Sequence, residues 1–305
     1  MKGMKDLKYK LTTGDYVFNS INYVVLTLFT LTCVIPFYYL FINTISDNTL
    51  VTKGLIVWLP QGIHFANYIQ ILKIDGLFNS VLVSVGRTVL GTVLTLVGTT
   101  FLGYAFSRPE FWKRKIWYRF VLITMYFNAG IIPWYINMKN LGLLNNFLAY
   151  IIPSIVAPFS LILFKTYVES IPSSLEESAD MDGAGYMTKY ARLIMPLSKP
   201  IVATLAVFSA VGQWNSFTDT LFLMTDPKYY SLQYMLYQYL NESNALADSL
   251  RQAAAAGSQV NLATVLTPTG VKMTISMVVV IPILCVYPFL QRYFVNGIML
   301  GAVKG

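Results

Sequence analysis

Six long runs of apolar residues dominate the chain, and shorter polar segments separate them. A helix needs about 20 mostly apolar residues to cross the hydrocarbon core of a membrane. A membrane-spanning β-barrel would show short strands of alternating polarity instead. The pattern therefore predicts an all-α membrane protein with six transmembrane helices. We expect these helices at Ile21–Asn43, Asn79–Ala105, Ile116–Met138, Phe147–Tyr167, Ile201–Met224 and Met273–Phe294.

Composition agrees with this fold class. Of the 305 residues, 55% are hydrophobic and 12% are charged, whereas a soluble domain has about 25% charged residues.

The chain begins with several lysines, but its first apolar run is long and ends in FYYLFINT, without the small residues of a cleavage site. We interpret this run as an uncleaved first span. No repeat or linker divides the chain, so we expect one membrane domain over residues 1–305, with a core at about 75–295 and an N-terminal tail at 1–20.

Basic residues predict the orientation. If the N-terminus is cytoplasmic, fourteen basic residues lie on the cytoplasmic side and six on the other, while Arg87 and Lys165 lie within or near spans. Because lysine and arginine concentrate in cytoplasmic loops, both termini are expected in the cytoplasm. The first group is Lys2, Lys5, Lys8, Lys10, Arg108, Lys113, Arg114, Lys115, Arg119, Lys189, Arg192, Lys199, Arg292 and Lys304; the second is Lys53, Lys73, Lys139, Lys228, Arg251 and Lys272.

Two loops are then expected outside the cell. Asp47–Leu77 contains GIHFANYIQILK, whose apolar residues have helical spacing and indicate a short amphipathic helix at the membrane surface. His64 lies there without a cluster of metal ligands, so we interpret it as a surface residue. Thr225–Lys272 is longer than a helical hairpin requires, which hints at a function. Cys33 and Cys285 fall in predicted spans and are expected to be buried, without a disulfide.

Small and hydroxyl-bearing residues recur every three or four positions in the second run and share one helical face. Such a face permits close helix packing, or it lines a polar passage. Arg87 on the same face favours contact with protein or water, because a charge within a span is costly. The apolar residues opposite are expected to face lipid or apolar helices. The polar face is Ser80, Ser84, Arg87, Thr88, Gly91, Thr95, Gly98 and Thr99; the opposite one is Leu82, Leu90, Val93 and Val97.

Several spans contain residues that weaken helices. A membrane helix tolerates proline and glycine where neighbouring helices satisfy the freed backbone groups. Together these residues indicate a bundle with bends rather than a rigid anchor. They are Gly130 and Pro133 in the third run, Pro153 and Pro158 in the fourth, and Pro282 and Pro288 in the sixth.

A polar segment between the fourth and fifth runs predicts a helix–turn–helix at 169–200, on the cytoplasmic face. Ser173 or Ser174 is expected to cap the first helix, with Glu176 and Glu177 near its positive end. Gly183 ends this helix, because glycine readily adopts a positive φ angle. The second helix is expected in YMTKYARLIM, before two prolines. A segment of this kind suits docking to a cytoplasmic protein, although a plain solvated connector is the alternative.

The same segment resembles the EAA motif of ABC importer membrane subunits, in particular maltose-type carbohydrate permeases. The match spans roughly 25 residues, with Ser178 in place of the usual first alanine. The tail QRYFVNGIMLGAVKG, the stretch GQWNSFTDTLFLM and the connection GIIPWYINMKNLGLLNNFLAYIIP are also similar to these permeases, most of all to the branch for complex oligosaccharides derived from polysaccharides. The residues of the EAA match are Glu177, Ser178, Ala179, Asp182, Gly183, Ala184, Tyr190, Ile194, Pro196 and Pro200.

The resemblance implies a type I importer in a bacterial cell membrane. This chain would pair with a homologous second permease, two cytoplasmic ATPases that use ATP and Mg²⁺, and an external solute-binding protein. It has no phosphate-binding loop of its own, so it would not be an enzyme, and no metal site is indicated. Coupling to the ATPases would involve Glu177, Ser178, Ala179, Asp182, Gly183, Ala184, Ile194 and Pro196. Tail contacts, from 295–305, would involve Asn296, Gly297, Gly301 and Lys304, and the candidate translocation path is Ser84, Arg87, Thr88, Thr95 and Asn215.

Alternative functions remain open from the sequence. An ABC permease for another class of solute would share every feature above. A secondary transporter would explain six bent spans but not the EAA-like segment. An intramembrane enzyme would require a catalytic cluster within the spans, and a structural scaffold would not require a cytoplasmic docking segment.

Overall fold

The structure is a computed structural model that describes residues 12–241 and 269–297. These residues are helical, with no β-strand among them, as the apolar pattern predicts. Besides the α-helices, η1, η2 and η4 are 3₁₀ turns and η3 is a π-helix. The elements are α1 (Thr13–Thr44), α2 (Asn48–Thr52), α3 (Ala66–Leu72), α4 (Leu77–Ser107), α5 (Arg114–Tyr126), α6 (Ile131–Asn140), η1 (Phe147–Tyr150), η2 (Ile152–Ser154), α7 (Pro158–Glu169), α8 (Ser173–Met181), α9 (Tyr186–Thr188), η3 (Lys189–Ile194), α10 (Met195–Leu197), α11 (Lys199–Asn215), α12 (Thr218–Leu223), η4 (Pro227–Tyr229) and α15 (Thr269–Gly297).

The chain divides into two compact units, and the first contains residues 1–70 and 267–277. Its long helix α1 starts at a capping box in which Thr12 and Asp15 bond each other's backbone N–H groups. Most of α1 is apolar and exposed, whereas its last turn is buried. There Ile42 packs with Val51 and Ile56 in a small core. A helix that is apolar all round is typical of a membrane span.

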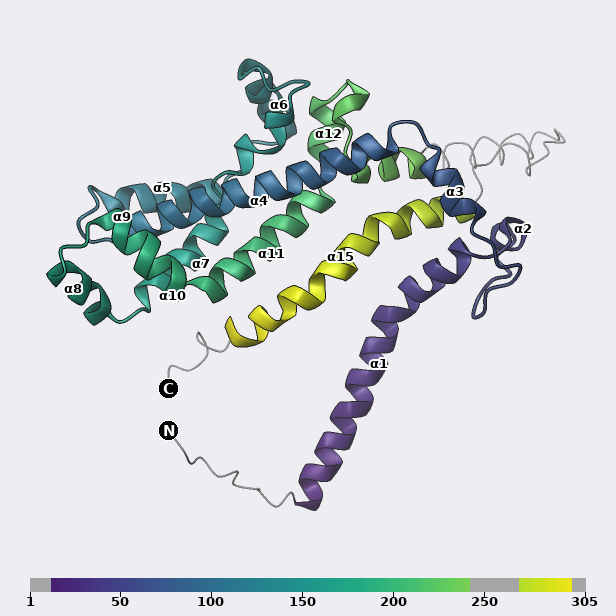
Figure 1. The fold of residues 1–305 in the computed structure, drawn as a ribbon, viewed down its shortest axis with the longest axis horizontal. Helices are drawn as coiled ribbons and strands as arrows, with labels where there is room; N and C mark the ends of the chain where they lie inside the picture. The colour runs from purple at the N-terminus through teal and green to yellow at the C-terminus, as the bar shows by residue number, and fades with distance from the viewer. Residues whose placement is uncertain (1–11, 242–268, 298–305) are drawn as a thin grey trace. The chain divides into compact units, whose positions relative to one another are not determined.

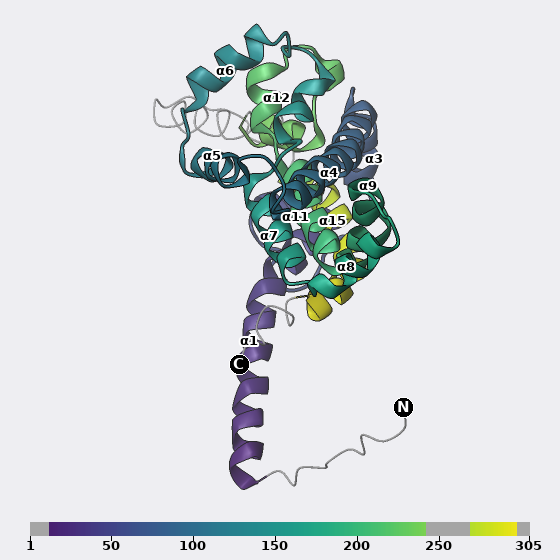
Figure 2. The same cartoon turned by 90° about the vertical axis from the view of Figure 1, so that its left-hand side faces the viewer.

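The second unit contains residues 71–266 and 278–305, and α4 lies at its centre. Helices α7 and α11 run alongside α4 in both views (Figures 1 and 2). Near the C-terminal end of α4, Tyr104 packs with Phe164 of α7, with Ile194 and with Leu205 of α11. A second cluster, around Val83, joins the other end of α4 to η1 and α12. The unit is thus held together by α4 and by two helices, α7 and α11, that pack against the face of α4 predicted to be polar.

Glycines on α4 allow these neighbours to approach closely. A Cβ atom added at Gly91 would lie 2.7 Å from the Gln213 side chain, and one added at Gly98 would lie 2.6 Å from the carbonyl oxygen of Ile155. Real Cβ atoms do not approach other atoms so closely, so a larger residue would push the helices apart. The opposite face, including Leu82, Val93 and Val97, is exposed.

The helix boundaries differ from the predicted spans in three places. The third run is not one helix, because α5 ends at Tyr126 and α6 begins after Gly130, whose φ angle is 89°. The fourth run begins as two 3₁₀ turns, and α7 is bent by 43° from them. The fifth run is interrupted at Ser216, where α11 gives way to α12. The first, second and sixth runs each lie within a single helix, α1, α4 and α15.

Within the described residues, α1 and α4 are long and apolar enough to cross a membrane individually. Two bent helix pairs raise that number to four if each pair is one span: Phe147–Ser154 with Pro158–Glu169, and Tyr186–Leu197 with Lys199–Asn215. The second pair is bent by 82°. Six spans therefore remain a prediction.

The loop predictions have mixed outcomes. Helix α3 lies within the expected amphipathic stretch and begins at Ala66, and His64 is half-buried just before it. Cys33 and Cys285 are exposed, so the prediction that they are buried is wrong. In the long second loop, residues 232–241 are helical, and 242–268 lie outside the described residues.

Candidate functional site

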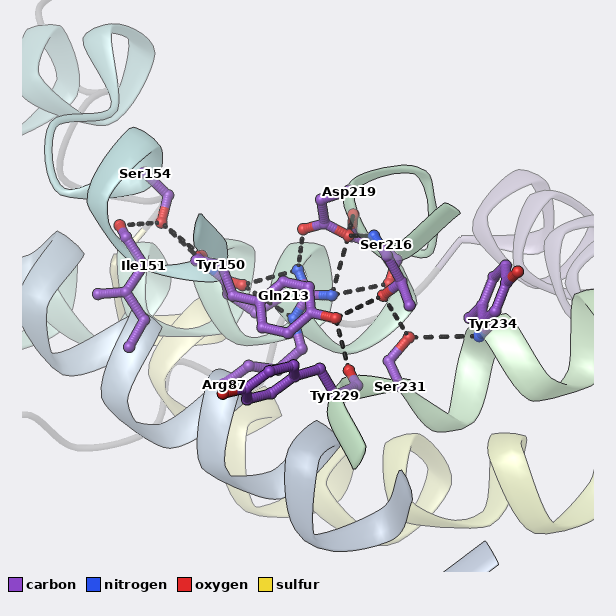
Figure 3. Close-up of polar contacts among 11 residues, drawn as sticks. Arg87, Tyr150, Ile151, Ser154, Gln213, Ser216, Asp219, Tyr229, Ser231 and Tyr234 are labelled. Atoms are coloured by element: carbon purple, nitrogen blue, oxygen red, sulfur yellow. Dashed lines mark hydrogen bonds and ion pairs between the residues drawn. The ribbon is translucent and has the colours of Figure 1, made fainter. Parts of the chain in front are cut away.

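Arg87 is the largest fully buried side chain in the described residues, with 2% of its surface exposed. Its guanidinium group donates to both carboxylate oxygens of Asp219, at 3.0 and 2.5 Å. It also donates to the side-chain oxygen of Gln213 and to the carbonyl oxygen of Ser216 (Figure 3). The guanidinium carbon lies 4.2 Å from the centre of the Tyr150 ring. A bidentate ion pair, three further hydrogen bonds and a cation–π contact therefore satisfy this buried charge.

The partners of Arg87 meet at the break between α11 and α12. Gln213 lies in the last turn of α11, Ser216 is the residue after it, and Asp219 lies in the first turn of α12. A carboxylate is favourable there because the start of a helix carries partial positive charge. The break also frees the carbonyl oxygen of Ser216 to accept from Arg87. Glycine at position 91, one turn along α4, leaves the space that Gln213 occupies.

The same network reaches the 3₁₀ turns before α7. The Gln213 amide donates to the carbonyl oxygen of Tyr150 and to the hydroxyl of Ser154, at 3.3 and 2.8 Å. The Tyr150 hydroxyl donates to the carbonyl oxygen of Tyr229 at 2.6 Å (Figure 3). From α4, the hydroxyl of Thr95 donates to the carbonyl oxygen of Ser154 at 2.7 Å. Polar side chains thus satisfy backbone groups that the irregular turns leave unpaired, as a nonpolar environment requires.

A cavity of about 450 Å³ opens beside this network. Its volume lies in the range typical of small-molecule sites, roughly 300–1,000 Å³. It combines aromatic rings, hydroxyl groups and the Arg87–Asp219 pair. The lining residues are Arg87, Thr95, Trp134, Ala149, Tyr150, Pro153, Ser154, Val156, Ala157, Ser160, Phe208, Ser209, Gly212, Gln213, Ser216 and Asp219.

A second feature is the helix–turn–helix formed by α8, α9 and η3. Gly183 follows α8 with a φ angle of 76°, and its N–H and that of Ala184 bond back to the last turn of α8. Asp180 forms an ion pair with Lys189 at 2.6 Å, which ties α8 to η3. Glu176 forms an ion pair with Arg108, the residue that follows α4. The turn is thus fixed at its glycine and by two ion pairs.

One side of this helix–turn–helix is exposed. Glu177 and Ser178 are exposed on α8, and Met181 has 89% of its surface exposed. The other side is anchored: Ile194 is fully buried, and the hydroxyl of Tyr190 is 2.9 Å from that of Thr100 on α4. The segment therefore presents an acidic and apolar surface on a base that packs against α4.

Comparison with known proteins identifies the family. Residues 99–300 match the model of the family described as "Binding-protein-dependent transport system inner membrane component". This chain belongs to that family. It is therefore an inner-membrane permease subunit of an ABC importer, in which separate subunits carry the ATPase activity. In general, such an importer also contains a partner permease and a binding protein.

Individual relatives extend over nearly the whole chain. The polygalacturonan/rhamnogalacturonan transport system permease protein YtcP of Bacillus subtilis is 32% identical over 289 residues, which are 95% of this chain and 99% of YtcP. The arabinooligosaccharides transport system permease protein AraQ of Halalkalibacterium halodurans is 27% identical, over 89% of this chain and 91% of AraQ. A chain in the crystal structure of a bacterial ABC transporter involved in the import of the acidic polysaccharide alginate is 31% identical, with a TM-score of 0.81 over 94% of this chain and 100% of that one.

The permease structure places the predicted path residues differently from one another. Ser84, Arg87 and Thr95 are buried, and each of them forms a hydrogen bond to a neighbouring segment. The hydroxyl of Ser84 accepts from the N–H of Leu232 at 2.8 Å. The Thr88 hydroxyl is buried without a hydrogen-bond partner in the described part of the chain. Asn215 is exposed at the end of α11. Their role in translocation stays a prediction.

Sequence reasoning missed the partners of Arg87 in this permease. Gln213, Asp219 and Tyr150 were not among the predicted path residues. Asp219 is the one acidic residue within the run Ile201–Met224, and a buried arginine requires a partner of opposite charge. That signal marks Asp219 as a candidate partner, whereas the contact itself is set by the fold.

The predicted coupling residues are mostly exposed, and one detail of the prediction is wrong. Neither Ser173 nor Ser174 caps α8: Pro172 is the cap residue, with no side-chain hydrogen bond. The hydroxyl of Ser178 instead donates to the carbonyl oxygen of Ser174 at 2.8 Å. Ala179 and Ala184 are half-buried, Asp182 and Pro196 are exposed, and Gly183 has the predicted positive φ angle.

The predicted second helix is not uniform, and the tail lies mostly outside the structure. After Gly185, the helix changes from α9 to the π-helix η3 and then to α10. Asn296 and Gly297 belong to the end of α15, whereas Gly301 and Lys304 lie outside the described residues. Within the described ranges, no group of three or more His, Cys, Asp or Glu side chains could hold a metal ion.

Proposed function

We propose that this permease subunit imports oligosaccharides through six transmembrane helices, with both ends of the chain in the cytoplasm. The named substrates of its relatives support this substrate class, because those of YtcP, AraQ and the alginate transporter are all saccharides. The excess of basic residues in the expected cytoplasmic segments supports the orientation. An importer for another class of solute is the alternative, and uptake by the reconstituted complex distinguishes them.

The helix–turn–helix is the proposed coupling element to one of the ATPases. The observation that carries this proposal is the exposed side of α8, with Glu177 and Met181, on a base anchored to α4 by Ile194 and Tyr190. A helix that packs on a moving subunit and is rigidly joined to the bundle transmits that motion. Closure of the ATPases would therefore rock α4 and its neighbours between inward-open and outward-open states.

The complete importer would contain this chain, a homologous second permease, two cytoplasmic ATPases and an external solute-binding protein. ATP and Mg²⁺ would be held by the ATPases. The proposed contact set on this chain is the one expected from the motif: Glu177, Ser178, Ala179, Asp182, Gly183, Ala184, Ile194 and Pro196.

Charge reversal at Glu177 tests the coupling role. In the reconstituted importer, Glu177→Lys is expected to lower the ATPase stimulation by loaded binding protein roughly tenfold, because a positive charge replaces a negative one at a docking contact. Asp75→Lys is the matched control, since Asp75 is an exposed acidic residue just before the opposite end of α4. Wild-type stimulation in Glu177→Lys, or an equal loss in the control, would contradict the proposal.

The C-terminal tail is proposed to contact the ATPases as well. Deleting residues 296–305 removes glycines and the basic residue Lys304 beyond the last predicted span. We expect the truncated chain to insert into the membrane but to recover less ATPase on co-purification. Normal ATPase recovery and normal turnover together would show that the tail is dispensable.

A further inference from the structure

The cavity beside Arg87 has the chemistry of a carbohydrate site. Three of its lining residues, Trp134, Tyr150 and Phe208, are aromatic and come from α6, η1 and α11. Aromatic faces pack against the C–H groups of sugar rings, while hydroxyl and amide groups bond to sugar hydroxyls. Hydroxyl groups from Ser160 and Ser209 line the cavity and make no hydrogen bond within the described ranges. They remain available to a ligand.

The charges that line the cavity cancel. Of the lining residues, Arg87 and Asp219 alone carry charge, and they form a bidentate pair with each other. Arg87 is 2% exposed, whereas the Asp219 side chain is 16% exposed. A carboxylate that enters the cavity therefore meets the carboxylate of Asp219, and the arginine that would attract it is already engaged. The lining thus favours hydroxyl groups over acidic groups.

We propose that this cavity is a saccharide subsite on this permease subunit, and that it binds an uncharged sugar unit. The proposal rests on the proposed function, to which it adds a binding site and a preference for neutral over acidic sugar units. A lipid chain would leave the two serine hydroxyls and the exposed edge of Asp219 without partners. A neutral pyranose ring satisfies them while its C–H face covers the aromatic rings.

Cysteine protection in the complete importer tests the subsite. Ser209→Cys places a thiol in the lining, in a chain whose exposed Cys33 and Cys285 are replaced by alanine. Val211→Cys is the control, because Val211 is exposed on the same helix and is not part of the lining. The probes are trigalacturonate and its carboxyl-reduced form, α-1,4-galactotriose, which differ in the acid groups alone. We expect galactotriose to slow labelling of Ser209→Cys at least fivefold, trigalacturonate to slow it little, and neither to affect the control.

The same protection assay in a Ser209→Cys chain that also carries Asp219→Asn tests the charge argument directly. This substitution leaves Arg87 without its counter-charge, so the expected preference reverses and trigalacturonate becomes the stronger protector. Assembly of the altered chain into the complete importer, measured by size-exclusion chromatography, reports whether it keeps its fold. Reversal supports the charge argument, whereas an unchanged preference in a folded chain overturns it.

Failure of the subsite and failure of the proposed function give different results. If the wild-type importer takes up oligosaccharides while Ser209→Cys reacts equally with and without either probe, the subsite is wrong and the function stands. If Ser209→Cys is unreactive in every state, a partner subunit fills the cavity and the subsite is again refuted. Equal protection by both probes overturns the neutral preference. A wild-type importer that takes up no oligosaccharide refutes the proposed function itself.

Discussion

At the scale of single residues, the packing around α4 depends on its glycines as much as on its polar side chains. Gly91 leaves room for Gln213, which in turn bonds to Arg87, Tyr150 and Ser154. Gly212 is also helical, but a Cβ added there would meet nothing within 4 Å. These two glycines therefore differ in their environment rather than in their intrinsic preference for a helix.

Alanine at each glycine separates the two effects. Gly91→Ala is expected to destabilise the permease by about 1–3 kcal/mol, because the new methyl group overpacks against Gln213. Gly212→Ala is expected to be neutral or to stabilise by up to about 1 kcal/mol through helix propensity. Thermal unfolding of the detergent-solubilised protein measures both. Equal effects of the two substitutions would show that Gly91 has no packing role.

At the scale of elements, the α8–α9 turn depends on one backbone conformation. Gly183 has a φ angle of 76°, whereas Gly185, two residues later, has a φ angle of −70°. A Cβ meets no neighbouring atom at either position. Alanine at either position therefore tests the backbone conformation alone, because the added methyl group meets no neighbouring atom.

Gly183→Ala should loosen the turn, and Gly185→Ala should not. A left-handed conformation costs an alanine about 1–2 kcal/mol, so we expect hydrogen exchange in Ser173–Met181 to accelerate by roughly tenfold in Gly183→Ala. At position 185 alanine adopts the native angles and reduces the entropy of the unfolded chain, which stabilises slightly. Exchange rates that respond alike to both substitutions would contradict the assignment of the turn.

At the scale of the whole molecule, the predicted topology places loops on opposite sides of the membrane. Gln61 and Lys115 are exposed residues in the expected outer and cytoplasmic segments. With Cys33 and Cys285 replaced, a membrane-impermeant thiol reagent is expected to label Gln61→Cys in intact cells. It is expected to label Lys115→Cys only after the cells are permeabilised. Labelling of both in intact cells would exclude the predicted arrangement of spans and termini.

The sequence by itself determined the features that depend on neighbouring residues. Runs of apolar residues located α1, α4 and α15, since membrane-length helices need no distant partner to satisfy their backbone groups. A three-to-four-residue period identified the buried face of α4, and one glycine marked the turn after α8. The match to the EAA motif identified the family, because that signature lies in about 25 consecutive residues.

Tertiary structure alone decided the partners of Arg87 and the breaks in the helices. Asp219 and Gln213 lie 132 and 126 residues from Arg87, so no local pattern joins them. The breaks after Tyr126 and Asn215 interrupt runs whose apolar content favours continuous helices. In the second case, a broken helix is stable because the buried arginine and its partners bond to the exposed backbone groups, which is a condition that only the folded unit satisfies.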